Sequence, residues 1–243
     1  MKTIALAILK GGTGKSTTAV NLAAALAERG NKVLLIDNDP QGSTTFISNV
    51  AYSHTITDVY HGERLQDAVT PWLEGIDVVP ADITLTQVDE EIREMKNRFF
   101  ILKNALSCMK TVYDFCIIDA APSLGMLTVD ALAAADKVII PLEPTPTAMR
   151  SLFLFFDTLD SVKPINPNIE YQILWTSYNP RLKLHQAALE AATAKALNIY
   201  PVAIVSNIRT AEAAGAHEPL LTYDPGNKNN AAYRTIAEME SIK

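Results

Sequence analysis

An eight-residue segment rich in glycine and lysine, KGGTGKST, lies close to the start of the chain, between an apolar run and a stretch of helix-forming residues. The run TIALAIL, residues 3–9, predicts a buried strand, and residues 16–29 predict a helix that ends before Gly30. Glycines in such a turn let backbone N–H groups face phosphate oxygens, and the positive end of the following helix favours the same ligand. The segment therefore predicts a phosphate-binding loop in an α/β protein.

The loop has two lysines where a phosphate-binding loop needs one. Lys15 is placed to reach the β- and γ-phosphates of a nucleotide, and the Ser16 hydroxyl is placed to bind Mg²⁺. A strict GxxxxGK[ST] motif would have glycine where this chain has Leu9, so the loop is a variant, and its first lysine is Lys10. The predicted nucleotide-binding residues of the loop are Lys10, Gly11, Gly12, Thr13, Gly14, Lys15, Ser16 and Thr17.

Further apolar runs alternate with helix-like stretches along the whole chain. The predicted strands after the first are residues 32–37, 76–80, 114–119, 137–142, 171–176 and 201–206. The predicted helices include one long helix over residues 88–109, followed by 128–136, 184–197 and a closing helix from residue 229. This alternation predicts a single α/β domain over residues 1–243, with a mostly parallel twisted sheet and helices on both faces.

Acidic residues follow two of the predicted strands. Asp37, Asp39 and Gln41 come at the end of one strand, and Asp119 ends another. Ligands of such sheets bind outside the carboxyl ends of the strands, so these side chains are expected beside the phosphate loop. Three carboxylates there would repel one another without a cation, and we therefore expect Mg²⁺.

Composition excludes several classes of protein. The net charge of −6 argues against a protein that coats nucleic acid over its whole surface, although residues 161–243 carry a net +1 against −7 for residues 1–160. Two cysteines provide neither a disulfide framework nor a zinc pattern, which favours a reducing cytoplasm. No signal peptide or apolar run of about 20 residues is evident. GGTG is not the GxGxxG of a dinucleotide site, which disfavours hydride transfer.

Four separated segments resemble, in the right order, the ParA-type ATPases of the deviant Walker A group, which also includes MinD. They are KGGTGKSTTAVNLAAALAERGNKVLLIDNDPQG, GIDVVPADITL, YDFCIIDAAPSLGMLTVDALAAADKVIIPLEP and NIRTAEAAGAHEPLLTYDPGNKNNAAYRTIAEME. Two positions depart from the family pattern. Leu9 replaces a residue that is usually polar, and PTPTAMRSLF lacks a glycine often found there.

The resemblance implies roles for particular residues. Lys10 would cross a nucleotide-sandwich homodimer and meet the phosphates held by the partner subunit, much as an arginine finger does. Asp39 would position the attacking water, while Asp37, Asp119 and Ser16 would act through the magnesium shell. Catalysis would then rest on charge stabilisation by Lys10, Lys15 and Mg²⁺. The adenine of ATP would lie near TSYNPR, with Asn179 and Arg181 as its contacts.

The resemblance also implies binding to DNA without sequence preference by the ATP-bound dimer. Arg209 matches a family DNA-contact arginine, and Lys183 and Arg234 are further candidates, together with Arg181, Lys195 and Lys228. Few residues precede the first strand, so we expect no separate operator-reading segment. The tail AAYRTIAEMESIK is poorly suited to membranes, because acidic residues oppose its basic ones and it has no Trp or Phe.

The sequence thus predicts a slow ATPase, located in the cytoplasm on the nucleoid, that segregates or positions a plasmid, a chromosome origin or a protein assembly. A ParB-like or other adaptor protein would stimulate its hydrolysis. Alternatives are a MinD-like membrane-associated positioning ATPase and an ATP-dependent ligase of the dethiobiotin-synthetase type. An electron carrier of the nitrogenase-reductase type is disfavoured, because Cys116 is predicted inside a strand and Cys108 in a helix.

Overall fold

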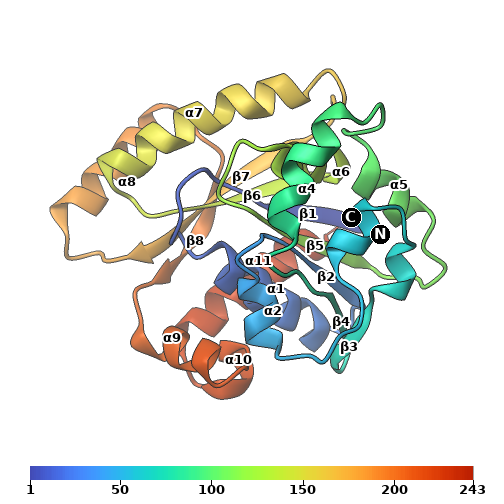
Figure 1. The fold of residues 1–243 in the computed structure, drawn as a ribbon. Helices are drawn as coiled ribbons and strands as arrows, with labels where there is room; N and C mark the ends of the chain where they lie inside the picture. Colours follow the sequence, from blue (N-terminus) through green and yellow to red (C-terminus); the bar gives the residue numbers. More distant parts are fainter. Residues whose placement is uncertain (243) are drawn as a thin grey trace.

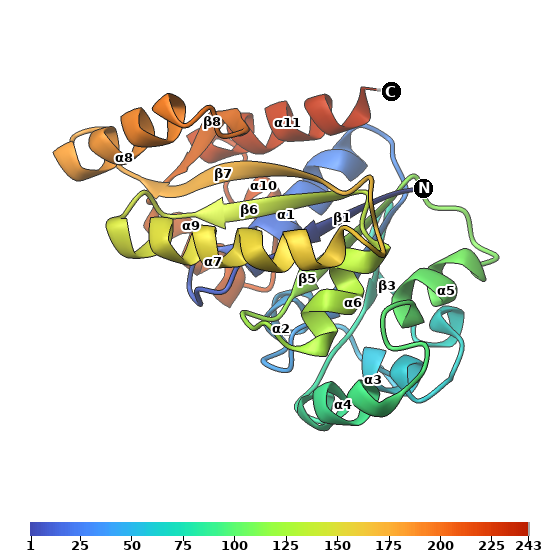
Figure 2. The same cartoon turned by 90° about the horizontal axis from the view of Figure 1, so that it is seen from above.

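The computed structural model describes residues 1–242 and shows one eight-stranded sheet with helices on both faces (Figures 1 and 2). The strand order is β3-β4-β2-β5-β1-β6-β7-β8, and only the pairing of β3 with β4 is antiparallel. The strands are β1 (Lys2–Leu6), β2 (Val33–Asn38), β3 (Thr70–Leu73), β4 (Ile76–Val79), β5 (Phe115–Ala120), β6 (Lys137–Leu142), β7 (Glu170–Tyr178) and β8 (Ile199–Val205). The predicted fold class and all seven predicted strands are confirmed.

The helices form two layers, one on each face of the sheet. They are α1 (Lys15–Glu28), α2 (Ser43–Ser48), α3 (Ile56–Tyr60), α4 (Leu85–Glu91), α5 (Ile101–Ser107), α6 (Met126–Ala134), α7 (Pro146–Val162), α8 (Lys183–Ala194), α9 (Ile208–Gly215), α10 (Leu220–Tyr223) and α11 (Lys228–Ser241). Side chains of α1 and α11 share one hydrophobic core with the sheet, and those of α3 to α7 share the other. The central strands β1, β2, β5 and β6 are buried on both faces, which explains why they read as continuous apolar runs.

The prediction of one long helix over residues 88–109 is wrong. α4 ends at Glu91, a 3-10 turn follows at Ile92–Glu94, and Met95 is extended with ψ 138°. A new helix, α5, then begins at Ile101. Its first N–H groups are satisfied from another helix, because the buried carboxylate of Asp130 on α6 accepts hydrogen bonds from the backbone N–H groups of Ile101 (2.9 Å) and Leu102 (3.0 Å). This capping carboxylate starts a second helix where local sequence predicts a continuous one.

The sequence analysis did not predict strand β3 or the helices α2, α3, α7, α9 and α10. The longest helix, α7, begins at a local signal: the Thr145 side chain accepts a hydrogen bond from the N–H of Ala148, and Pro146 occupies the first turn. Strand β3 is short and lies at the sheet edge, where its Pro71 is tolerated.

The last helix, α11, is anchored to the opposite edge of the sheet from the phosphate loop. Its buried Glu240 forms ion pairs with Lys2 (2.8 Å) and Lys137 (2.5 Å) and accepts a hydrogen bond from Tyr200. Lys2 and Lys137 are the first residues of β1 and β6, so this carboxylate joins the closing helix to the amino-terminal ends of two strands. The apolar face of α11 is buried, as the sequence predicts.

Candidate functional site

The phosphate loop connects β1 to α1, as predicted, and is shaped by two glycines. Gly12 (φ 71°) and Gly14 (φ 87°) adopt left-handed backbone conformations that other residues disfavour. Gly14 is the N-cap of α1 and offers no side-chain acceptor, so the first N–H groups of the helix are left for a ligand. From the neighbouring strand β7, the Thr176 hydroxyl donates a 2.8 Å hydrogen bond to the Thr13 carbonyl, which fixes the loop against the sheet.

A cavity of about 650 Å³ lies over this loop. It is lined by most of the predicted phosphate-binding residues, from Gly11 to Thr17 except Thr13, and by Asp39 and Gln41. Pro122, from the segment after β5, also lines it. The structure therefore brings together residues that lie more than 100 positions apart in the chain, at the carboxyl edge of the sheet.

Lys15 is the buried cation of this cavity. The residue is only 6 % exposed. Burial lowers the pKa of its ammonium group, and the negative charges of Asp119 and Asp39 act in the opposite direction. A desolvated lysine beside open helix N–H groups provides concentrated positive charge for a polyphosphate.

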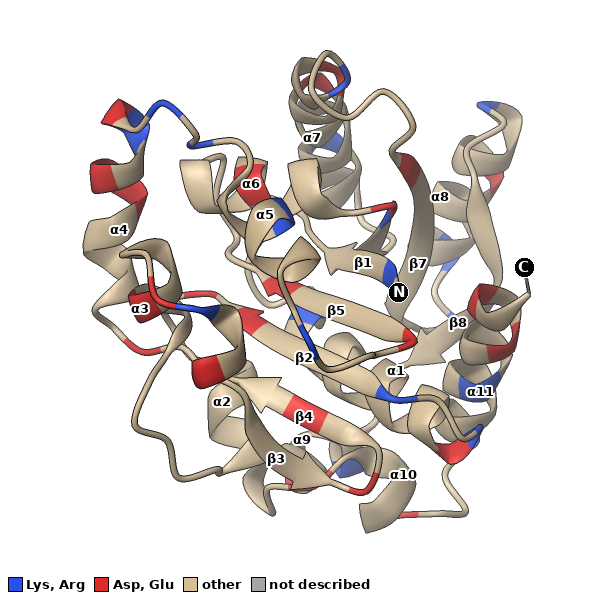
Figure 3. Ribbon diagram, turned by 90° about the vertical axis from the view of Figure 1, so that its right-hand side faces the viewer, with Lys and Arg blue, Asp and Glu red and all other residues tan. Residues whose placement is uncertain are grey.

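Asp37 and Asp119 are direct neighbours on β2 and β5, and both are fully buried; Figure 3 shows acidic segments on these two strands. Burial and the charge of Asp119 raise the pKa of Asp37 to about 8. Burial raises the pKa of Asp119 to about 6, although the nearby hydroxyls of Ser16 and Thr44 lower it. Two buried carboxylates side by side are costly without a cation, which is the electrostatic condition expected at a magnesium site.

The two carboxylates differ in what they already bind. Asp37 accepts hydrogen bonds from the N–H of Asp39 and from the N–H and hydroxyl of Thr45, so it holds the start of α2 in place. Asp119 accepts one hydrogen bond from Thr44, at 2.8 Å, and its Oδ1 is buried with no partner of hydrogen-bonding geometry. Asp119 thus has an oxygen available to the water shell of a magnesium ion, whereas Asp37 is already engaged by hydrogen bonds. The metal roles of Asp37, Asp119 and Ser16 stay predictions.

Within residues 1–242, no three His, Cys, Asp or Glu side chains are grouped closely enough to hold a metal ion by themselves. Mg²⁺ commonly keeps several waters and binds through one or two carboxylates together with substrate phosphates. A site built from Asp119, the Ser16 hydroxyl and nucleotide oxygens agrees with this preference.

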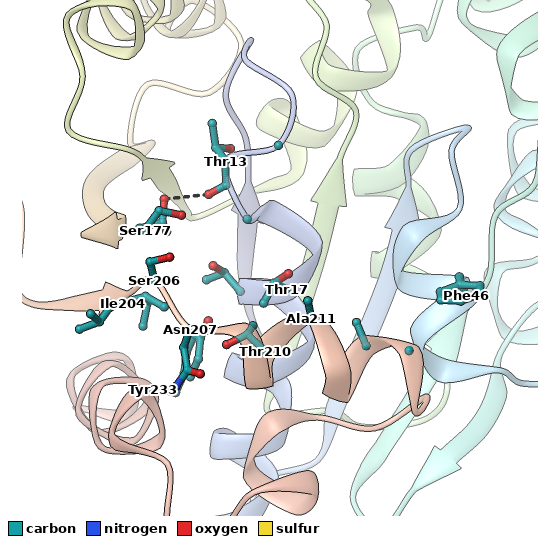
Figure 4. A pocket seen from close by; sticks show the side chains of 17 residues that line it. Thr13, Thr17, Phe46, Ser177, Ile204, Ser206, Asn207, Thr210, Ala211 and Tyr233 are labelled. Carbon is teal, nitrogen blue, oxygen red and sulfur yellow. Dashed lines mark hydrogen bonds between the residues drawn. The ribbon is translucent and has the colours of Figure 1, made fainter. Parts of the chain in front are cut away.

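A second cavity of about 560 Å³ adjoins the first and is shown in Figure 4. Gly12, Gly14 and Thr17 of the phosphate loop and first turn of α1 line both cavities. The second cavity extends to the ends of β7 and β8 and to α9, where Ser177 and Asn207 line it. The two together form a space that continues from the phosphate loop toward the C-terminal third of the chain.

The residues predicted for the adenine do not line this second cavity. The Asn179 side chain accepts a hydrogen bond from the N–H of Arg181 (3.0 Å), and its own N–H donates to the buried His185. The cavity is instead lined by Thr18, Thr210 and Tyr233, whose buried hydroxyls have no partner of hydrogen-bonding geometry within residues 1–242. Thr210 and Tyr233 lie within the C-terminal segment that resembles the family, which was the only signal for them in the sequence.

Lys10 lies about one third exposed at the start of the phosphate loop. Its ammonium group is 3.6 Å from a carboxylate oxygen of Glu143, in the segment between β6 and α7. In the single chain, the lysine predicted to act in a partner subunit therefore forms an ion pair within its own subunit. Its role across a dimer stays a prediction.

Two of the three predicted DNA-binding residues are engaged by acidic neighbours. Arg209 forms ion pairs with Glu212 (2.7 Å) and Asp224 (3.4 Å), and Arg234 forms one with Glu28 (2.6 Å). Figure 3 shows basic and acidic segments next to one another on α11. Lys183, the first residue of α8, is exposed and has no ion-pair partner among residues 1–242. The positive charge available to DNA in the free subunit is thus smaller than the sequence suggests.

Two further observations concern membrane-spanning segments and the cysteines. None of the helices within residues 1–242 is long and apolar enough to cross a bilayer. Cys116 is fully buried inside β5, and Cys108 is exposed just beyond α5.

Comparisons with known proteins agree with this site. The family model of an AAA domain matches residues 1–171. The chromosome partitioning protein ParA of Caulobacter vibrioides is 36% identical over 247 aligned residues, which cover 98% of this chain and 92% of the relative. The sporulation initiation inhibitor protein Soj of Bacillus subtilis is 34% identical over 245, covering 98% and 97%.

Solved structures are similar over the same extent. McdA of Cyanothece in an ATP complex has a TM-score of 0.90 at 25% identity, covering all of this chain and 97% of that one. Cobyrinic acid a,c-diamide synthase of Mycobacterium smegmatis, with bound ATP analog and magnesium, has a TM-score of 0.86 at 30% identity, covering 98% and 93%. From its phosphate loop, its paired aspartates and these full-length similarities, the chain belongs to the ParA and Soj family of partition ATPases.

Proposed function

We propose that this chain is an ATP- and Mg²⁺-dependent ATPase that dimerises when it binds ATP, binds DNA without sequence preference and segregates or positions a cargo. The observation that carries the proposal is the pair of adjoining cavities, one over the phosphate loop and one with three unpartnered hydroxyls. The first has the charge for a triphosphate and the second has the size and polarity for a base. The proteins named ParA and Soj, and the ATP-bound McdA structure, support this assignment.

Different residues of the chain serve nucleotide binding and hydrolysis. The loop N–H groups and Lys15 bind the phosphates, and bound Mg²⁺, held beside Ser16 and Asp119, supplies positive charge to the phosphate oxygens. Asp39 lines the same cavity and accepts a hydrogen bond from the N–H of Gln41, which orients its carboxylate. We assign Asp39 to positioning the attacking water. Lys10 neutralises the phosphates of the partner subunit in the dimer.

This assignment is tested by separating nucleotide binding from dimerisation. Lys10→Ala is expected to bind a fluorescent ADP analogue within about twofold of the wild type, because Lys15 and the loop N–H groups remain. It is expected to lose the dimer that the wild type forms with a non-hydrolysable ATP analogue, measured by sedimentation velocity. The matched control is Lys32→Ala, which removes an exposed lysine directly before β2, at the opposite edge of the sheet. Unchanged dimerisation of Lys10→Ala would refute the role across the dimer.

The water-positioning role has its own test. Asp39→Ala is expected to keep the ATP-bound dimer and to lose phosphate release, since the charge needed for binding stays in place. Phosphate release is measured with and without double-stranded DNA. Rapid turnover by this variant would contradict the role of Asp39.

A synthetase function remains the second candidate, because the structure of the Mycobacterium smegmatis synthase is similar to this chain at 30% identity. The two functions differ in what they require. A synthetase needs an acceptor substrate before it consumes ATP, whereas a positioning ATPase releases phosphate with ATP and water alone. Phosphate release that is slow without additions and rises with DNA or with an adaptor protein supports the positioning ATPase; strict dependence on a small acceptor supports the synthetase.

A further inference from the structure

Helix α6 begins without a capping side chain of its own. Its N-cap residue is Gly125, which has no side-chain acceptor, although the first N–H groups of a helix need one. The acceptor comes from α4, since Oδ1 of Asp89 accepts a 3.0 Å hydrogen bond from the N–H of Leu127, 38 residues away. A carboxylate at this end of a helix is also favoured by the helix dipole.

Gly125 makes this contact possible. Its backbone φ of −69° is open to any residue, so the glycine is not required by conformation. A Cβ at this position would lie 2.6 Å from Oδ2 of Asp89 and closer still to Oδ1, which is nearer than real Cβ contacts come. Any side chain here would therefore displace the Asp89 carboxylate. Asp89 and Gly125 form a matched pair across two helices.

The carbonyl of Leu127 is bound by a residue that lies beside the nucleotide site. The Leu127 carbonyl accepts a 3.1 Å hydrogen bond from the side chain of Asn38. Asn38 is fully buried and lies between Asp37 and Asp39, and its side-chain oxygen accepts a hydrogen bond from Tyr60. Leu127 is thus held at its N–H by Asp89 and at its carbonyl by the residue next to the predicted water-positioning aspartate.

The segment between β5 and α6 is fixed by the same turn of helix. The Thr128 hydroxyl donates a 3.2 Å hydrogen bond to the Ala121 carbonyl, and Ala121 directly precedes Pro122, which lines the phosphate cavity. Asp119 lies two residues before Ala121 and carries the free carboxylate oxygen. The start of α6 therefore sets the position of the segment that faces the phosphates.

We propose that Asp89 is a positioning residue for ATP hydrolysis, acting through Leu127 on the start of α6 and on the segment from Asp119 to Pro122. It touches neither nucleotide nor metal. The proposal rests on the ATPase function proposed above. Reacting groups that are displaced by a fraction of an ångström lose rate more than they lose affinity, so the effect falls on kcat.

The test compares variants of the pair. Asp89→Ala is expected to lower kcat for ATP about fivefold to tenfold, the effect of a lost helix cap carried to the site, while affinity for a fluorescent ADP analogue stays within about twofold. Asp89→Asn keeps an acceptor oxygen and should restore much of kcat. Gly125→Ala should be at least as impaired as Asp89→Ala, and the double variant no worse than Asp89→Ala, because the displaced carboxylate is then absent.

Arg93 provides the control for this series. It forms an exposed ion pair with Asp89 at 3.3 Å, so Arg93→Ala should change kcat by less than about twofold if only the helix cap is involved. A normal kcat for folded Asp89→Ala would overturn the proposal. The proposal would also be overturned if Gly125→Ala lowered kcat by the same factor in the Asp89→Ala variant as in the wild type.

Hydrogen exchange separates this proposal from the proposed function. In Asp89→Ala without nucleotide, the Leu127 amide should exchange faster than in the wild type, while amides in α1 keep their rates. This readout needs no hydrolysis. If the wild type hydrolyses no ATP but the Leu127 amide responds, the proposed function fails and the capping contact stands; if the amide does not respond, the positioning role fails whatever the activity.

Discussion

The hydrogen bond between Thr176 and the phosphate loop allows a quantitative prediction about nucleotide affinity. The hydroxyl of Thr176 on β7 donates to the carbonyl of Thr13, 163 residues away in sequence, and both residues are buried. Thr176→Val keeps the shape of the side chain and removes the donor. Removing one partner of a buried hydrogen bond costs about 1–3 kcal/mol.

The loop must be held in its binding conformation to align its N–H groups on the phosphates. If 1–2 kcal/mol of that cost falls on this conformation, nucleotide affinity should decrease about 5–30-fold. The assay is an equilibrium titration of a fluorescent ADP analogue, with a thermal unfolding curve to establish that the variant is folded.

Thr176→Ser is the matched control, because it keeps the hydroxyl and loses only the methyl group, which lies near Gly14. It should bind the nucleotide within about threefold of the wild type. If Thr176→Val bound the analogue as tightly as Thr176→Ser, the contact would not hold the loop, and the reasoning would be refuted.

Three further predictions concern stability, dimerisation and DNA. Burial would raise the pKa of Glu240, but hydrogen bonds from its basic and tyrosine partners outweigh it and lower the pKa. Glu240→Gln should therefore cost about 3 kcal/mol at neutral pH and lower Tm by roughly 6–12 °C, whereas the exposed Glu238→Gln should change little. Because the folded-state pKa is lowered, this stabilisation exists above the unfolded pKa and is lost as pH falls, so the Tm gap must close in acid; a gap that widens would contradict it. Glu143→Gln frees Lys10 from its ion pair and should tighten the ATP-dependent dimer, by no more than about fivefold for a surface pair, in sedimentation across a concentration series; an unchanged or weaker dimer would show that the two contacts do not compete. Arg209→Ala should weaken DNA binding equally for all sequences and reduce the salt dependence by about one counterion, measured by filter binding at several salt concentrations; an unchanged slope would remove Arg209 from the interface.

Much of the fold and of the phosphate site could be predicted from the sequence, because the signals are local. Each central strand is a continuous apolar run, since it is buried on both faces. The phosphate loop is a short motif between a strand and a helix, and Asp39 and Asp119 come directly after or at the end of strands. Parallel strands carry such residues to one edge of the sheet, and the structure places them there.

Other parts of the site were decided by tertiary structure. The second cavity is built from the ends of β7 and β8, α9 and α11, so the residues that line it share no local pattern. Asn179 and Arg181 do not line it, and their contact with adenine stays a prediction. The charge of Arg209 is compensated by Asp224, 15 residues away, which a count of basic residues does not detect.

The sequence by itself determined seven of the eight strands, the phosphate loop and the family, because these follow from periodicity and from short contiguous motifs. Only the tertiary structure decided where the long predicted helix breaks, which carboxylate caps which helix, and which aspartate keeps a free oxygen. The physical reason is that a hydrogen bond between distant segments depends on how those segments pack. The local sequence around either partner does not specify which group will lie opposite it.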